Sequence, residues 1–330
     1  MLLKESIAIK NLTLHNRLVL PPMATGNCGS DGEVTEELLT YYREICEGGH
    51  IGLVITEHAY IHPRGKAGNG QISVADDARV PGLRRLVDMS HACGSKVICQ
   101  INHAGSATNA DVTGGLEPFG PSAVAHPKQI DVVHRPITQE EIAEIPALYA
   151  NAARRAKEAG YDGVEIHSAH GYFLNQFYSP VTNLRTDAYG GSLENRIRLH
   201  REVIRAVRAE VGEDYLIALR LGGSDYMDGG ATIADAVYAC KVFAEEGVDL
   251  IDLSGGMCTF RIKGRNYPGY FRDMSEAVKA EVNLPVILTG GVQHASEAEI
   301  LLQEGAGDLI GVGRAIFRDH RWAEKEMTAI

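Results

Sequence analysis

The chain has 330 residues, of which 45% are hydrophobic and 23% are charged. This globular composition excludes an intrinsically disordered or fibrous protein. The 32 Lys and Arg residues against 43 Asp and Glu residues give a formal net charge of −11, which argues against nucleic acid and anionic lipid as partners.

The N-terminal sequence MLLKESIAIK lacks the long apolar segment and small-residue cleavage site of a secretory signal. No window approaches the ~20 consecutive apolar residues that span a membrane. We therefore expect a cytoplasmic protein with no membrane partner. The 6 cysteines are scattered without a C-x-x-C pair or a zinc or iron–sulfur spacing, so we expect reduced and mostly buried thiols.

Short apolar runs alternate with segments of helical periodicity along the whole chain. The runs cover residues 18–20, 53–56, 97–101, 163–167, 216–221, 250–254, 286–289 and 309–312. Runs of this kind are typical of parallel strands buried on both faces. Eight strand–helix units without a linker predict a (β/α)8 TIM barrel, formed as a single domain by residues 1–330. An open, doubly wound sheet is the structural alternative.

Several local signals mark the helix ends. The pairs Thr138 with Glu141 and Ser296 with Glu299 have the spacing of capping boxes. Gly160 and Gly247 follow helical segments as C-cap candidates. Pro146 lies inside a helical segment, where it is expected to kink the helix or to open its main portion.

One longer segment, Ala104 to Pro136, follows the third predicted strand and is rich in Gly, Pro and polar residues. Such excursions commonly carry function in barrel proteins. We expect it to fold as a lid or hairpin over one barrel mouth.

Polar residues gather where the predicted strands end, which is the edge where TIM barrels place their active sites. The fourth strand ends in His167, and His170 and Tyr172 follow closely. These side chains supply hydrogen-bond donors and a titratable phenol. Each alone would be read as a packing residue, but three after one strand favour a functional site.

The last two strands run into glycines. Gly290 and Gly291 follow the seventh strand, and Gly313 and Arg314 follow the eighth. Such glycines let backbone N–H groups approach a phosphate, and the arginine adds a fork of donors. The pattern predicts a phosphate-bearing ligand, with tight strand-to-helix turns as the alternative.

Arg220 interrupts the apolar fifth strand, where burial is costly without an anionic partner. The partner is either a negatively charged cofactor group or an internal carboxylate, for which Glu165 and Asp252 are the candidates. The loop after the sixth strand carries Arg261, Lys263 and Arg265. These side chains either contact an anionic substrate or the second phosphate of a dinucleotide, or remain solvated.

The segment from Gly163 to Arg198, GVEIHSAHGYFLNQFYSPVTNLRTDAYGGSLENRIR, strongly resembles the signature of the old yellow enzyme family of FMN-dependent ene-reductases, in a single-domain form. Shorter matches extend over most of the chain. They are NRLVLPPM from Asn16, TEHA from Thr56, QINHAGS from Gln100, LRL around Arg220, TGGV from Thr289 and GVGRA from Gly311.

The resemblance implies an NAD(P)H:flavin oxidoreductase that reduces activated alkenes such as α,β-unsaturated carbonyl compounds, with FMN across the barrel mouth and NADH or NADPH as hydride donor. In the family pattern His167 and His170 bind the substrate carbonyl, and Tyr172 is the proton donor. Arg220 would face the flavin N1/O2 edge. The residues implied to line the flavin ring are Pro22, Met23, Ala24, Ala59 and Gln100, and those for its phosphate are Gly290, Gly291, Gly313 and Arg314.

Two features depart from the family pattern. Ala24 stands where many members carry Thr or Cys near flavin O4, and the neighbouring Thr25 is the candidate to compensate. The chain also ends soon after the eighth strand, without the cysteine cluster and added domains of longer dienoyl-CoA reductase and trimethylamine dehydrogenase relatives. The resemblance therefore favours direct use of the nicotinamide by one FMN domain. It selects neither NADH nor NADPH, nor the substrate, and it is compatible with a homo-oligomer.

Two alternatives stay open at this point. One is a metal-dependent barrel hydrolase, whose candidate ligands are His58, His103, His167 and His170. The other is a non-catalytic barrel that binds a flavin or another phosphate-bearing ligand.

Overall fold

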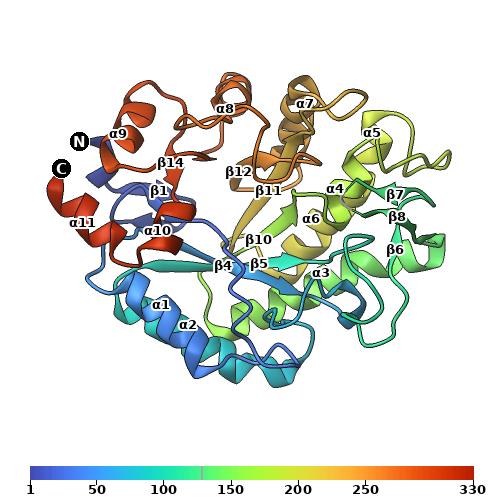
Figure 1. The fold of residues 1–330 in the computed structure, drawn as a ribbon, viewed down its shortest axis with the longest axis horizontal. Coiled ribbons are helices and arrows are strands. Elements are labelled where there is room, and N and C mark those ends of the chain that lie inside the picture. Colours follow the sequence, from blue (N-terminus) through green and yellow to red (C-terminus); the bar gives the residue numbers. More distant parts are fainter. Residues whose placement is uncertain (128) are drawn as a thin grey trace.

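The computed structural model describes residues 1–127 and 129–330. At its centre is a closed barrel of parallel strands in the order β10-β11-β12-β13-β14-β3-β4-β5 (Figure 1). The strands are β3 (Leu18–Leu20), β4 (Leu53–Tyr60), β5 (Lys96–Asn102), β10 (Gly163–Ser168), β11 (Leu216–Ser224), β12 (Leu250–Gly255), β13 (Val286–Thr289) and β14 (Leu309–Gly311). The predicted TIM barrel is confirmed, and the open sheet is wrong, because β14 pairs with β3 and β5 pairs with β10.

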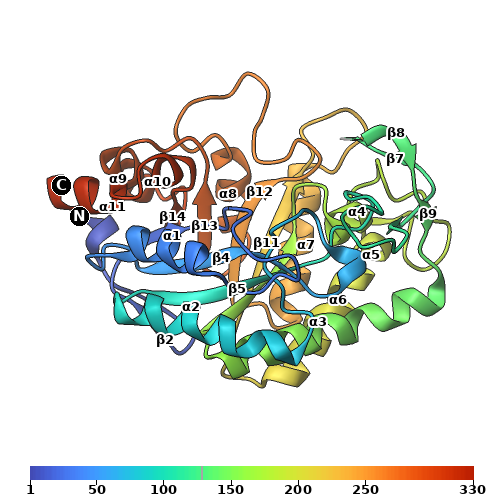
Figure 2. The ribbon, with the colours of Figure 1, turned by 60° about the horizontal axis from the view of Figure 1, so that its bottom comes forward.

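Helices surround the barrel strands (Figure 2). They are α1 (Glu36–Cys46), α2 (Val80–Ala92), α3 (Gln139–Ala159), α6 (Arg198–Val211), α7 (Ile233–Glu245), α8 (Arg272–Lys279), α9 (Ala295–Gln303), α10 (Arg314–Arg318) and α11 (Trp322–Ala329). The short helices α4 (Phe173–Tyr178) and α5 (Leu193–Arg196) follow β10, and 3-10 turns cover Leu2–Lys4, Pro63–Gly65 and Asp77–Arg79. In the part of the chain that the structure describes, no helix is both long and apolar enough to cross a bilayer.

The end of the barrel where the strands begin is filled with apolar side chains. An N-terminal hairpin of β1 (Ile7–Ile9) and β2 (Leu12–Leu14) packs there on the inward-facing residues of the strands. Among them are Val19, Leu53 and Ile98, all fully buried. Because this end is packed, the polar residues of the barrel interior lie toward the opposite mouth.

The helix-end predictions are confirmed at α3 and wrong at α9. Thr138 and Glu141 form the predicted capping box, and α3 continues across Pro146, so the proline does not open the helix. At α9 the box is instead made by His294, because its N3 residue is Glu297. Glu299 does not cap the helix, because it accepts hydrogen bonds from the backbone N–H groups of Leu2 and Leu3, at 3.0 and 2.8 Å.

The excursion after β5 forms two small sheets beside α4 (Figures 1 and 2). β6 (Phe119–Gly120) pairs with β9 (Arg135–Pro136), and β7 (Ala125–His126) pairs antiparallel with β8 (Gln129–Val133). His126 Nε2 lies 2.9 Å from the carbonyl oxygen of Gly171, in the loop after β10. A lid function for this segment stays a prediction, and its residue 128 lies outside the described residues.

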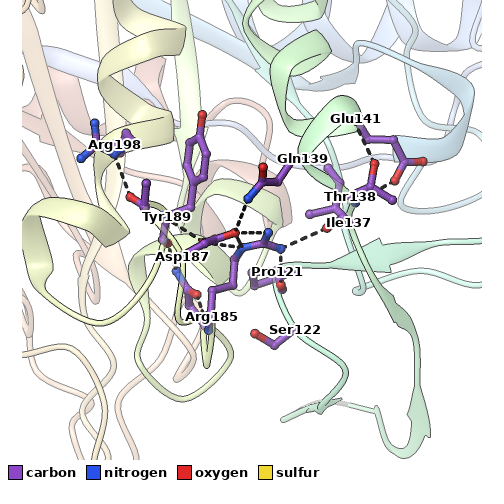
Figure 3. A network of polar contacts seen from close by, with 12 residues as sticks. Pro121, Ser122, Ile137, Thr138, Gln139, Glu141, Arg185, Asp187, Tyr189 and Arg198 are labelled. Atoms are coloured by element: carbon purple, nitrogen blue, oxygen red, sulfur yellow. Dashed lines mark hydrogen bonds and ion pairs between the residues drawn. The ribbon is translucent and has the colours of Figure 1, made fainter.

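Arg185 ties this excursion to the segment that follows α4 (Figure 3). Its Nη1 donates to the carbonyl oxygens of Pro121 and Ile137, at 2.9 and 3.0 Å, and its Nε donates to Asp187 Oδ1 at 3.0 Å. The Arg185 guanidinium lowers the pKa of Asp187 to about 2. Arg185 therefore holds two distant segments together through its bonds to the Pro121 and Ile137 carbonyls, while Asp187 in its own loop orients the guanidinium.

Candidate active site

A cavity of about 340 Å³ opens at the ends of the barrel strands. Of the site residues expected from the sequence, those that line this cavity are Pro22, Met23, Ala24, Gln100, His167, His170, Tyr172, Arg220, Gly290, Gly291, Gly313 and Arg314. These residues come from the loops and strand ends all around the barrel. The fold thus brings together at one mouth groups that are almost 300 positions apart.

Ala59 is the expected lining residue that does not reach the cavity. Leu53 and Ile55 face the barrel interior, so strict alternation would point residue 59 inward. One extra residue interrupts the β4–β5 pairing between Thr56 and Ala59, and such a bulge reverses the alternation. Ala59 is consequently buried in the outer core, and His58 lines the cavity in its place.

His167, His170 and Tyr172 form one cluster on the cavity wall. The ring centroid of His167 lies 5.2 Å from those of both His170 and Tyr172. A left-handed turn makes this possible, since His170 has φ of 61° and Gly171 has φ of 78° just after β10 ends. His170 Nε2 lies 2.7 Å from Ser254 Oγ on β12, which fixes the orientation of that ring.

Burial decides the protonation of the phenol in this cluster. Desolvation raises the pKa of Tyr172, because the charged phenolate is disfavoured away from water. The side chain therefore carries its proton at neutral pH. This is the state that a proton donor requires.

Another part of the cavity suits an anion. Gly290 has φ of 135° and Gly291 has φ of 78°, and a Cβ on Gly290 would come within 2.9 Å of the Tyr270 ring. Arg314 Nη2 lies 3.2 Å from the Tyr270 hydroxyl. Among the residues that the structure describes, Arg314 has no carboxylate within ion-pair distance. A cationic fork beside glycine backbone is suited to a phosphate group.

The structure supplies one of the two partners that the sequence left open for Arg220. Its Nε lies 2.9 Å from Asp252 Oδ2, so the internal ion pair is confirmed with Asp252, and the side chain also lines the cavity. Glu165 lies alongside and accepts a 2.7 Å bond from Gln100 Nε2.

Burial and the second carboxyl group raise the pKa of Glu165 well above its ordinary value, and burial raises that of Asp252 to about 6. The positive charge of Arg220 is thus balanced by the Asp252 carboxylate, and Glu165 retains a proton. The positive charge at the cavity wall is largely compensated from within the barrel.

The loop after β12 contributes aromatic lining residues that no sequence motif marked. Phe260, Tyr270 and Phe271 come from this region, and Tyr270 donates from its hydroxyl to the Phe260 carbonyl at 2.6 Å. Arg265 is paired with Asp273 at 2.8 Å, which accounts for its charge inside the protein. The remaining lining residues not singled out above are Pro21, Thr289, Val292 and Gly311.

Two expectations from the sequence are not met by the side-chain positions. Thr25 does not line the cavity, because its hydroxyl donates to Glu57 Oε2 at 2.7 Å, so it does not replace the side chain that Ala24 lacks. The four histidines of the hydrolase alternative do not form one site, because His58, His167 and His170 line the cavity and His103 does not. His103 is stacked on Phe119 at 5.2 Å beside a second, smaller cavity, and burial lowers its pKa to about 3.

Comparisons with known proteins agree with this geometry. Residues 3–329 match the model of the NADH:flavin oxidoreductase / NADH oxidase family. The chain is 38% identical over 322 residues to an NADH oxidase of Thermoanaerobacter brockii, covering 96% of this chain and 49% of that protein. It is 36% identical to an NADPH dehydrogenase of Halalkalibacterium halodurans, covering 96% of this chain and 91% of that protein.

A solved structure extends the likeness to the fold. An old yellow enzyme homologue from Zymomonas mobilis superposes with a TM-score of 0.85 at 27% identity, over 98% of this chain and 92% of that one. The chain thus spans about half the length of the Thermoanaerobacter relative and nearly all of the other two proteins.

Proposed function

The chain belongs to the NADH:flavin oxidoreductase / NADH oxidase family, as its resemblance to the old yellow enzymes predicts, and we propose that it uses FMN to reduce activated alkenes with NADH or NADPH. The substrates we propose are α,β-unsaturated carbonyl compounds. The observation that carries the proposal is the convergence of His167, His170 and Tyr172 on the cavity that also contains Arg314 and its glycine neighbours.

The cavity residues fit FMN on their own chemistry. Arg314 offers hydrogen-bond donors and has no competing carboxylate among the described residues. At Gly290 a side chain would collide with the Tyr270 ring, so only glycine leaves the backbone there open to a phosphate. We assign the phosphate to Gly290, Gly291, Gly313 and Arg314. We assign the ring to the wall made by Pro22, Met23, Ala24, Gln100 and Arg220.

FMN bound there would supply the hydride-transfer chemistry between the nicotinamide and the β-carbon of the alkene. His167 and His170 donate hydrogen bonds to the substrate oxygen, on which negative charge develops during that transfer. Ser254 holds His170 in place for this task. Tyr172 then gives its phenolic proton to the α-carbon, as a general acid.

The colour of the protein tests this assignment. Protein reconstituted with FMN is expected to show bound-flavin absorption that bleaches with NADPH without oxygen and returns when 2-cyclohexenone is added. Tyr172→Phe should leave the bleaching intact and slow its return about 100-fold or more. Equal loss in both half-reactions would contradict the role of Tyr172. Flavin that no alkene reoxidises would select the non-catalytic alternative.

A further inference from the structure

His58 is a third imidazole on the wall of the cavity, and the mechanism above gives it no role. Its ring centroid lies 5.2 Å from that of Tyr172, with an angle of 38° between the ring planes, and 6.1 Å from that of His167. The bulge in β4 that turns Ala59 outward is what brings this ring to the cavity. His58 therefore belongs to the cluster that surrounds the phenol.

The partners of the His58 ring decide which nitrogen carries its hydrogen. Gln71 Oε1 accepts from the backbone N–H of Ala67 at 2.6 Å, so the orientation of the Gln71 amide is fixed. Its Nε2 then donates to the His58 carbonyl oxygen at 2.9 Å and faces His58 Nδ1 at 2.7 Å.

A hydrogen on Nδ1 would meet a donor, so Nδ1 must accept, and the neutral ring carries its hydrogen on Nε2. Asn102 Nδ2 lies 3.3 Å from the same Nδ1. Gln71 and Asn102 are both buried, which keeps water from competing for this nitrogen. The tautomer is thus set from outside the cavity, and the opposite nitrogen of the ring is a donor.

We propose that His58 is a positioning residue for Tyr172, whose Nε2–H donates to the phenol oxygen and leaves the phenol O–H directed at the substrate. This inference rests on the proposed function. In the transfer step the O–H bond of Tyr172 breaks, a C–H bond forms at the α-carbon, and the electron pair stays on the phenol oxygen. His58 keeps its own proton and stabilises the phenolate, which then regains a proton from solvent.

A hydrogen bond to a charged acceptor in a buried site corresponds to roughly 10- to 100-fold in rate. The effect should appear only in the step that uses the Tyr172 proton. Hydride transfer from NADPH to the flavin does not use that proton, so this half-reaction serves as an internal control. A role of His58 in packing alone would affect both half-reactions or neither.

The experiment is stopped-flow measurement of both half-reactions on the FMN-loaded protein, with NADPH for reduction and 2-cyclohexenone for reoxidation. His58→Leu should slow reoxidation roughly 10- to 100-fold and change reduction by less than about 3-fold. His58→Gln, which can place an amide N–H near the position of Nε2, should recover most of the rate. In a Tyr172→Phe background, His58→Leu should have almost no further effect on reoxidation.

Gln71→Leu provides a second route if His58→Leu does not fold, since it removes the fixed donor at Nδ1 without altering a cavity-lining residue. It should slow reoxidation in the parent and not in the Tyr172→Phe background. Equal slowing in both backgrounds, or no rescue by His58→Gln, overturns the inference. If Tyr172→Phe does not slow reoxidation, Tyr172 is not the acid and the proposed function fails. If Tyr172→Phe slows reoxidation and His58→Leu does not, only the inference about His58 fails.

Discussion

Asp252→Asn and Glu165→Gln remove one carboxyl group each from the same buried network, yet we expect very different effects on stability. Arg220 is 4% exposed and Asp252 is fully buried, with 2.9 Å between the Arg220 Nε and Asp252 Oδ2 atoms. At an effective dielectric constant of about 20, two unit charges at this separation attract by about 6 kcal/mol. Asparagine keeps the shape of the side chain but leaves the arginine charge without its counterion.

The amide dipole of the new asparagine recovers part of that attraction, so we expect Asp252→Asn to lower the free energy of unfolding by roughly 3–5 kcal/mol. Glu165 differs because it already carries a proton. In Glu165→Gln the amide oxygen can still accept from Gln100, and the NH2 group can donate as the carboxylic acid did. The expected loss is about 0–1 kcal/mol.

Equilibrium urea unfolding at pH 7, followed by far-UV circular dichroism, measures the difference between the two variants. Both variants and the parent must be in the same state of flavin loading, since a bound ligand stabilises the folded protein. Equal destabilisation by the two substitutions would refute the reasoning, because it would mean that both carboxyl groups are ionised. A stable Asp252→Asn would show that another anion balances Arg220.

Three further predictions use the same approach. Arg314→Ala should weaken FMN binding about 10-fold or more in a fluorescence titration and leave riboflavin binding unchanged, because only FMN carries the phosphate; equal weakening of both would place Arg314 elsewhere. Ser254→Ala should release the His170 ring and weaken phenol binding several-fold at unchanged melting temperature. The control Ser90→Ala, at a buried serine that does not line the cavity, should leave phenol binding unchanged. Arg185 holds the pKa of Asp187 at about 2, below its ordinary value of 3.8, so the ion pair stabilises the fold above pH ~4 and loses this effect as the pH falls toward 2. Asp187→Asn should therefore destabilise the protein near neutrality and converge with the parent in acid, and a difference that does not depend on pH would contradict the ion pair.

The sequence by itself determined the barrel and most of the residues that line the cavity at its mouth. Apolar runs buried on both faces mark the strands wherever they occur, and the C-terminal ends of parallel strands necessarily meet at one mouth. The cluster of His167, His170 and Tyr172 follows a single strand, so its members were certain to lie close together. Local chain signals of this kind do not depend on the rest of the fold.

The tertiary structure alone decided how side chains share partners across distant segments. One extra residue in the β4–β5 pairing exchanges Ala59 for His58 at the cavity, and no signal in the strand itself marks that insertion. Ser254 contacts His170, which is 84 positions away in the sequence. Glu299 accepts a hydrogen bond from the backbone N–H of Leu3 instead of capping its own helix. Strand register and competition for hydrogen bonds are settled only when separate elements pack, which is why the sequence located the site but not the contacts that orient it.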